Sequence, residues 1–159
     1  MSAFEARPPY RSYAAILGLY AAGLAGAGAL SRSLDRDPQC QTALDLGVLG
    51  LATFKVARTL SRDSVASFVR EPFVRGDARS GDEEPVRTSG FDEAIGELVT
   101  CTRCIGTWAA AGLASTQILA PRFGRLLMWS LGAAAANDFL QAGFASLTAK
   151  ANELETGTV

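Results

Sequence analysis

Seventeen consecutive residues without a charged side chain, residues 14–30 (AAILGLYAAGLAGAGAL), most strictly limit what this chain can fold into. A helix crosses a bilayer with about 20 mostly apolar residues, in a range of about 17–25, so this segment is long enough to span. A second charge-free run occupies residues 105–120 (IGTWAAAGLASTQILA). Neither run offers a polar face to water, so both favour a lipid environment.

Two further apolar segments, residues 42–60 and 126–147, contain charged or amide side chains within an otherwise apolar pattern. Together the four segments predict an all-α fold, a four-helix transmembrane bundle with spans at about 14–30, 42–60, 105–120 and 126–147. We expect a single membrane domain, residues 1–159, whose long loop, residues 61–104, contains short interfacial helices. The charged and amide residues of the segments 42–60 and 126–147 are Asp45, Lys55, Arg58, Asn137, Asp138 and Gln141.

Two alternatives to this arrangement stay open. Arg7 and Arg11 precede the first segment, which ends in small residues, so a cleaved signal peptide is one interpretation of it. A soluble, alanine-rich helical bundle is the other. We favour the membrane interpretation because residues 14–30 and 105–120 lack the polar face that a helix needs at a water-exposed surface.

Lysine and arginine are divided unequally between the two ends of the predicted helices. The end that holds both termini and the 61–104 loop carries nine of them, and the opposite end carries four. Since loops rich in lysine and arginine stay in the cytoplasm, we expect both termini and the long loop on the cytoplasmic side of the inner (plasma) membrane. Cys101 and Cys104 then face a reducing compartment, and Cys40 lies across the bilayer.

A charged side chain within a membrane span is unfavourable in lipid and needs a partner. The second and fourth predicted helices both run inward, so the depths of their charges can be compared. At about 1.5 Å per residue, Lys55 lies roughly 20 Å from the start of its segment and Asp138 roughly 18 Å from the start of its own. We therefore predict a Lys55–Asp138 ion pair that fixes the register of two helices. A proton or ion path through the pair is the alternative. Asp45 lies near the outer edge, where we expect either water or Arg125 to contact it.

The 61–104 loop shows internal order in its sequence pattern. Residues 61–73 (SRDSVASFVREPF) predict a short helix with Ser61 as its N-cap. Residues 91–100 (FDEAIGELVT) predict a second, amphipathic helix. Between them, residues 77–85 (DARSGDEEP) have no apolar periodicity and predict a flexible acidic tip.

Two separated stretches, ARTLSRDSVASFVREPF and AIGELVTCTRCIGTW, together resemble the domain of unknown function 1360 family, over roughly residues 54–145. The resemblance implies a small bacterial multi-pass membrane protein, and some members of the family are linked to sporulation. The family's pattern has proline after the first cysteine, where this chain has Thr102. We expect Glu97 to pair with Arg103 or Arg70. The positions that match the family's motifs are Arg58, Leu60, Asp63, Arg70, Pro72, Phe73, Gly96, Glu97, Leu98, Cys101, Cys104 and Trp108.

Cys101 and Cys104 have the C-x-x-C spacing found in redox and metal sites. Zinc needs four ligands, so in a chain without histidine a closed site would take one cysteine pair from each of two copies. As a redox pair at a helix N-terminus, beside Arg103, Cys101 would be the nucleophile and Cys104 the resolving thiol. Membrane thiol oxidases use a second cysteine pair as a relay, and this chain has only three cysteines. A structural or docking turn, with small apolar thiols packed beneath Trp108, is therefore the leading expectation, and whether the pair is free, oxidised or metal-bound stays open.

Composition narrows the function further. The 15 basic and 16 acidic residues are nearly balanced, without the clustered basic excess of a nucleic-acid-binding protein. The chain has no histidine, and so lacks the usual general base. We expect a non-enzymatic membrane scaffold, without a cofactor, that contacts lipid and docks an unknown cytoplasmic protein through residues 61–104. Homo-oligomerisation is a further expectation. The alternative is a membrane thiol–disulfide redox protein that uses Cys101 and Cys104.

Overall fold

The computed structural model describes residues 8–36, 41–88 and 90–156, and over these residues the chain is mostly α-helical. Its four long helices are α1 (Tyr10–Ser33), α2 (Ala43–Arg62), α5 (Thr102–Leu119) and α6 (Pro121–Thr156). Each matches one predicted apolar segment closely, except that α6 continues to Thr156 because residues 148–156 contain good helix formers. The all-α class is therefore confirmed. Arg7 and Cys40, which entered the topology prediction, lie outside the described residues.

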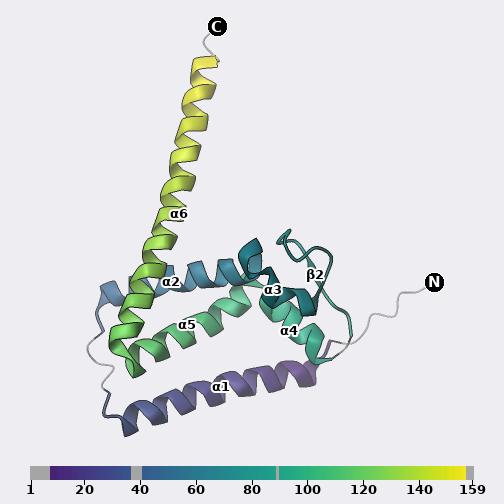
Figure 1. The fold of residues 1–159 in the computed structure, drawn as a ribbon, viewed down its shortest axis with the longest axis vertical. Helices are drawn as coiled ribbons and strands as arrows, with labels where there is room; N and C mark the ends of the chain where they lie inside the picture. The colour runs from purple at the N-terminus through teal and green to yellow at the C-terminus, as the bar shows by residue number, and fades with distance from the viewer. Residues whose placement is uncertain (1–7, 37–40, 89, 157–159) are drawn as a thin grey trace, which may run out of the picture.

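The long helices form three neighbours and one that diverges (Figure 1). α5 lies between α1 and α2, whereas α6 crosses α2 and then projects away from the other helices. Of the helices in the described ranges, α1 alone is long and apolar enough, by length and composition, to cross a membrane. The four membrane spans therefore stay a prediction.

A small core joins α2, α5 and α6. Val48, Ala52, Leu113 and Met128 are buried together there. Gly132 of α6 lies so close to α2 that a β-carbon at this position would be 3.2 Å from Val48 Cγ1. The missing side chain thus allows the two helices to cross at close range.

The predicted ion pair between α2 and α6 is confirmed. Lys55 Nζ donates a hydrogen bond to Asp138 Oδ2 at 2.8 Å, and the two side chains are 24% and 36% exposed. Beside the pair, the rings of Phe54 and Phe139 stack with their centroids 5.0 Å apart. Gly132 lies against Val48, and further along both helices Asp138 pairs with Lys55. At their contact, α2 and α6 therefore run in the same sense, as the comparison of depths requires.

α2 begins with a capping box. The Asp45 N–H donates to Thr42 Oγ1 at 3.2 Å, and the Thr42 N–H donates to Asp45 Oδ2 at 2.9 Å. Arg125 Nη2 lies 3.6 Å from Asp45 Oδ1, so of the two expected partners, Arg125 contacts Asp45. The carboxylate inside this apolar segment therefore serves to start the helix.

Residues 61–104, here called the loop module, are folded over their described positions. The loop module contains η2 (Ser64–Ala66), α3 (Ser67–Arg70), η3 (Glu71–Phe73), β1 (Val74–Arg75), β2 (Glu84–Pro85) and α4 (Phe91–Thr100). The bounds of α4 are those predicted. The helix predicted over residues 61–73 is instead broken into three short pieces. Ser61 lies in the last turn of α2 and caps no new helix, because Asp63 takes an extended conformation that ends α2.

A two-stranded hairpin closes the acidic segment of the loop module. β1 and β2 pair antiparallel, with Val74 opposite Pro85, and the Val86 N–H donates to the Phe73 carbonyl at 3.0 Å. Gly81, at a φ of 76°, supplies a backbone conformation that other residues rarely adopt. The prediction of a flexible tip over residues 77–85 is therefore wrong: turn geometry and hydrogen bonds order a segment that has no apolar periodicity.

Candidate functional site

A fully buried arginine holds the loop module together. The guanidinium of Arg70 donates to the carbonyl oxygens of Leu60 at 2.9 Å, Asp63 at 3.1 Å and Ala78 at 2.6 Å. Its Nε donates to the Glu83 carboxylate, and both side chains are almost completely inaccessible to solvent. The planar fork of donors thus joins the end of α2 to the hairpin connection. Arg70 is a motif position, whereas nothing in the sequence pattern points to Glu83.

A second arginine fixes the hairpin connection from outside. Arg62 Nη1 donates to the Gly81 carbonyl and lies 3.3 Å from Asp82 Oδ1. A β-carbon at Gly81 would be 2.7 Å from the Arg62 carbonyl oxygen, so the connection packs directly on the last turn of α2. The acidic segment is therefore attached to α2 at two arginines.

Gly96 is a position of close approach between α4 and the hairpin. A β-carbon there would be 2.5 Å from the Phe73 carbonyl oxygen and 3.1 Å from Pro85 Cβ. Two motif positions, Phe73 and Gly96, thus come into direct contact. The geometry explains why this place in α4 has no side chain.

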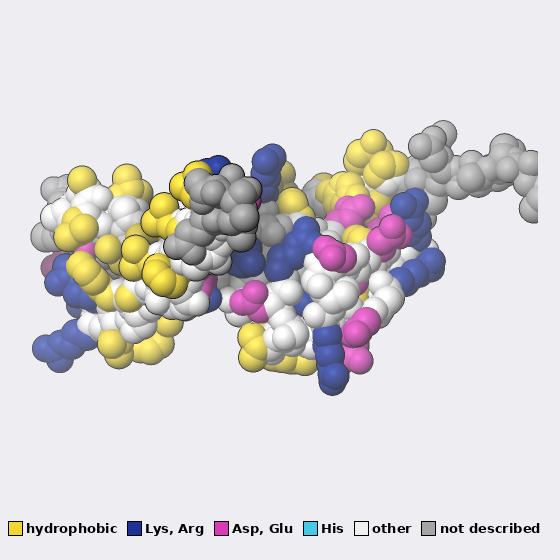
Figure 2. All heavy atoms as spheres, turned by 90° about the horizontal axis from the view of Figure 1, so that it is seen from above, with side chains coloured by type: hydrophobic (Ala, Val, Ile, Leu, Met, Phe, Trp, Pro, Cys, Tyr) yellow, Lys and Arg dark blue, Asp and Glu magenta, His cyan; other side chains and the backbone are white. Residues whose placement is uncertain are grey.

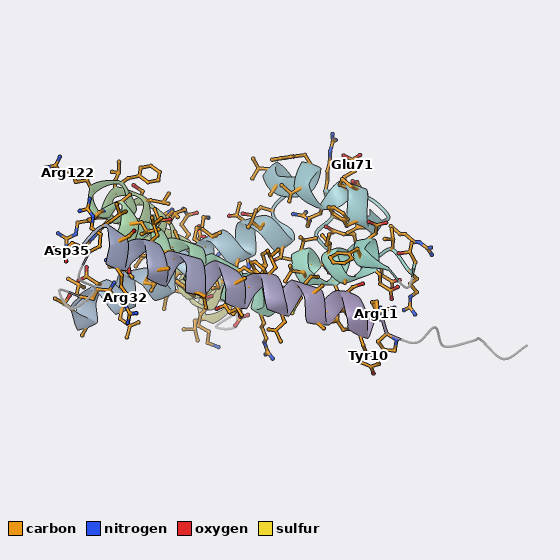
Figure 3. The ribbon with its side chains drawn as sticks, turned by 90° about the horizontal axis from the view of Figure 1, so that it is seen from below. Tyr10, Arg11, Arg32, Asp35, Glu71 and Arg122 are labelled. Atoms are coloured by element: carbon orange, nitrogen blue, oxygen red, sulfur yellow. A yellow bond between two sulfur atoms is a disulfide. The ribbon has the colours of Figure 1, made fainter. Side chains whose placement is uncertain are left out.

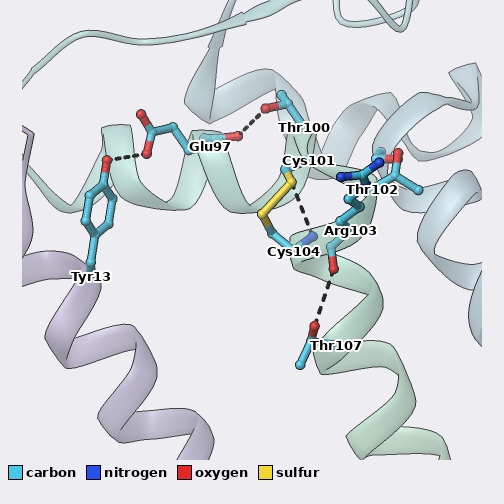
Figure 4. Close-up of a disulfide and its surroundings, with 10 residues drawn as sticks. Tyr13, Glu97, Thr100, Cys101, Thr102, Arg103, Cys104 and Thr107 are labelled. Carbon is cyan, nitrogen blue, oxygen red and sulfur yellow. Dashed lines mark hydrogen bonds between the residues drawn. A yellow bond between two sulfur atoms is a disulfide. The ribbon is translucent and has the colours of Figure 1, made fainter.

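Cys101 and Cys104 are joined by a disulfide at the start of α5 (Figure 4). Cys101 is the N-cap residue of α5, and its Sγ accepts a hydrogen bond from the Cys104 N–H at 3.2 Å. The oxidation state that the sequence leaves open is here a disulfide, because the helical start brings the two sulfurs within bonding reach. Within the described ranges, no group of three or more His, Cys, Asp and Glu residues is placed to hold a metal ion.

Thr102, at the position where the family's pattern has proline, makes a contact that proline cannot make. Its Oγ1 lies 2.8 Å from Ser61 Oγ, a side chain that is buried in the last turn of α2. Proline is favourable at the first position of a helix, so threonine is not needed here to form the helix. What Thr102 adds is the hydroxyl group. The C-x-x-C turn is thereby attached to the end of α2.

An apolar cavity of about 400 Å³ lies between α1, α4 and α5 and is here called the cysteine cavity. Tyr20 and Trp108 form one wall with their rings edge to face, 5.2 Å between centroids. Cys104 lines this cavity, and Cys101 does not. Cys104 is also exposed, whereas Cys101 is half-buried. Further apolar walls come from Ile16, Leu17 and Leu98.

Glu97 connects α4 to α1. Its carboxylate accepts a hydrogen bond from the Tyr13 hydroxyl, at the edge of the cysteine cavity (Figure 4). The expected pairing of Glu97 with Arg103 or Arg70 is wrong, because Arg70 is buried against Glu83 and Arg103 is exposed. Tyr13 is another site residue that sequence reasoning missed.

Other predicted residues gather at a second cavity of about 400 Å³, between α2 and α6. Arg58 and Asp63, from the family motif, line it together with Asp138 and Gln141 from the fourth predicted span. The structure thus brings motif residues and the Lys55–Asp138 ion pair to one place. Asn137 is exposed and lies outside this group.

The outer surface of the loop module combines charge with a small apolar patch. Figure 2 shows most of the visible acidic side chains gathered on the right, over the loop module. Val65 and Phe68, three residues apart, are 75% and 72% exposed, and Pro72 is also exposed. These side chains are mostly exposed and accessible to a partner.

The two ends of the helical array differ in what they carry. Arg32, Asp35 and Arg122 lie at one end, and Arg11 and Glu71 lie at the other (Figure 3). The second end is also that of the loop module and the start of α1 (Figure 1). The chain connections predicted for the two sides of a membrane are therefore at opposite ends of the array.

A family model described as "Protein of unknown function (DUF1360)" matches residues 48–144, which is more than half of the chain. The matched range includes the loop module, both cysteines of the disulfide and the Lys55–Asp138 pair. No curated protein and no solved structure matches the chain.

Proposed function

The chain belongs to the DUF1360 family, and we propose that it is a bacterial multi-pass protein of the inner (plasma) membrane with four spans. The length and composition of α1 support this proposal. Large apolar side chains are also exposed on α2 and α6, among them Leu46 of α2 and Leu126 and Leu140 of α6. An apolar surface of this kind is unfavourable in water and suited to lipid.

The proposed orientation places both termini and the loop module in the cytoplasm. It is supported by the nine-to-four division of lysine and arginine. The placement of Arg32 and Arg122 at the end of the array opposite the loop module is consistent with it (Figure 3).

We propose that the loop module docks a cytoplasmic protein. One observation carries this proposal: Arg70, fully buried, binds Glu83 and three carbonyl oxygens, and so makes residues 61–104 a preformed surface. A preformed surface loses little conformational freedom on binding. Phe68 and Val65 are large apolar side chains exposed on it, which fits an apolar pocket in a partner.

Photo-crosslinking in living cells tests the docking proposal. A photoreactive amino acid at Val65 or Phe68 is expected to give the same discrete protein adduct, and the adduct at Val65 is expected to disappear when Phe68→Asp is added. The control position is Leu154, exposed at the far end of α6, which should not give this adduct. Adducts with lipid alone, or an adduct at Val65 that survives Phe68→Asp, would overturn the proposal.

The Cys101–Cys104 disulfide favours a second function, thiol–disulfide exchange. A disulfide that closes so short a loop removes little conformational entropy from the unfolded chain. It therefore adds little to stability, which argues against a purely stabilising role. On the proposed orientation the pair faces the cytoplasm, where disulfides are usually catalytic or redox-sensing.

The redox state of the pair in cells tests this second function. Cells are quenched in acid and their free thiols tagged with a mass-bearing maleimide, in a Cys40→Ser background that leaves only the pair to count. A redox-active pair should shift towards the reduced form with dithiothreitol and back with diamide. A pair that stays wholly reduced or wholly oxidised through both treatments contradicts the function.

A further inference from the structure

The two cysteines of the disulfide differ in access, and this difference bears on the proposed redox function. Cys104 is exposed and lines the cysteine cavity, whereas Cys101 is half-buried outside it. Thiol–disulfide exchange begins when a thiolate reaches one sulfur of the disulfide. Cys104 is the more accessible residue of the two, which reverses the order expected from the sequence.

The surroundings of Cys101 suit it to be the sulfur that leaves. Cys101 is the N-cap of the 18-residue helix α5, so its sulfur lies at the positive end of the helix dipole. The Cys104 N–H donates to Cys101 Sγ at 3.2 Å. Both interactions stabilise negative charge on the sulfur, and a stabilised thiolate is the better leaving group.

The cysteine cavity indicates which thiols reach Cys104. Its walls at Ile16, Leu17 and Leu98 are apolar, so a thiol with apolar neighbours gains by entering it. The carboxylate of Glu97 lies at its edge and repels acidic thiols such as glutathione.

We propose that the disulfide accepts two electrons from a protein dithiol whose attacking cysteine is flanked by apolar residues, with attack at Cys104. The substrate thiolate bonds to Cys104 Sγ, the bond to Cys101 breaks, and its electron pair stays on Cys101. The second substrate thiolate then attacks the substrate sulfur of the mixed disulfide and releases Cys104. The substrate becomes a disulfide, and the two protons of its thiols are taken up by Cys101 and Cys104. This inference rests on the redox function proposed above.

Mapping of the attacked sulfur tests the proposal on the purified full-length chain. The oxidised protein is treated with octanethiol, quenched with iodoacetamide and digested with trypsin, which separates the two cysteines by cleaving after Arg103. The expected products carry the octyl disulfide on Cys104 and the carbamidomethyl group on Cys101. Octyl on Cys101 would overturn the assignment while leaving the redox function standing. A disulfide that no thiol opens would remove both.

A matched pair of substitutions on α1 tests the role of the cysteine cavity. Leu17 lines the cavity and Leu19 does not, although they are 68% and 65% exposed. Leu17→Trp is expected to slow the reaction with octanethiol about tenfold and that with 2-mercaptoethanol less than about twofold, since only the apolar chain needs the filled space. Leu19→Trp should react like the wild type with both thiols. Equal rates for Leu17→Trp and wild type with octanethiol would show that the cavity does not select the thiol.

Discussion

At the scale of single residues, the Lys55–Asp138 pair shows what sequence reasoning can locate. Each charge lies in a mostly apolar segment, and a uniform helical rise converts sequence position into depth. The two depths agree, and the structure joins the side chains at 2.8 Å. The pairing was predictable because a charged side chain in lipid needs a partner of opposite charge, and few residues of the predicted spans could be that partner.

The free energy that the Lys55–Asp138 pair contributes to folding depends on whether the pair lies in lipid or in water. Asp138→Leu leaves Lys55 without its counter-charge and should destabilise the protein by about 2.5–3.5 kcal/mol if the pair lies in the membrane interior. The double variant Lys55→Leu/Asp138→Leu should recover most of that loss. Unfolding by denaturant in bicelles gives both values.

A double-mutant cycle over Lys55 and Asp138 gives the coupling energy between the two side chains. A coupling energy below about 1 kcal/mol is that of a pair open to water, and would contradict the membrane placement of α2 and α6. The alternative, a proton or ion path through the pair, is tested by measuring ion flux in vesicles that contain the Asp138→Asn variant. If the path exists, this variant should assemble normally and lose the flux.

Arg70, Glu83 and Tyr13 show what sequence reasoning could not reach. Arg70 was assigned by its motif position, but its burial depends on carbonyl groups of Leu60, Asp63 and Ala78, which have no side-chain signature. The Tyr13 hydroxyl binds Glu97, a residue 84 positions further along the chain. Polar contacts of this kind follow from tertiary arrangement, and apolar periodicity carries no information about them.

At the scale of elements, α4 and the segment before the hairpin make the same point. α4 has a regular apolar face over residues 91–100, and its predicted bounds are the observed ones. Residues 61–73 have a similar pattern, yet the chain breaks there so that Arg70 can reach its partners. A strong network of buried hydrogen bonds overrides a short helical preference.

The loop module should therefore depend on Arg70 more than on any exposed arginine. Arg70→Lys keeps the charge but loses the planar fork, and removal of a buried partner typically costs about 3–5 kcal/mol. We expect faster hydrogen exchange across residues 74–86, measured by mass spectrometry. Arg75→Lys, at an exposed position in β1, is the control and should leave exchange unchanged. Equal protection in the two variants would show that Arg70 does not organise the loop module.

The crossing of α2 and α6 depends on the small surface of Gly132. Gly132→Leu places a side chain against Val48 and should destabilise the protein by about 1–3 kcal/mol, as overpacking usually does. Gly143→Leu is the matched control on the same helix, because a β-carbon there meets no atom within 4 Å. Thermal unfolding in detergent compares them. Similar midpoints would mean that the crossing is not closely packed.

At the scale of the whole molecule, the helical array separates two sets of connections. The loop module and the start of α1 lie at one end, and the turn between α5 and α6 lies at the other (Figure 1). The general course of the long helices was predictable from four apolar segments. The divergence of α6 was not, because side-chain contacts with α2 set its crossing and sequence patterns do not encode angles.

Labelling of introduced cysteines tests the orientation of the array. In a chain whose own three cysteines are replaced by serine, Arg122→Cys should react with a membrane-impermeant maleimide in intact cells. Arg75→Cys, in the loop module, should react only after permeabilisation. Both positions are exposed, so access to reagent and not burial decides the result. The reverse pattern would invert the proposed topology, and equal labelling of both in intact cells would exclude it.

The length and direction of α6 determine where its last turns lie. Its 36 residues rise about 54 Å, against a hydrocarbon thickness of about 30 Å. The last turns carry Lys150, Asn152 and Glu153, which suit water. Because α6 also projects away from α1, α2 and α5, these last turns stand clear of the loop module, and a protein fused after Thr156 is held apart from any partner that docks there (Figure 1).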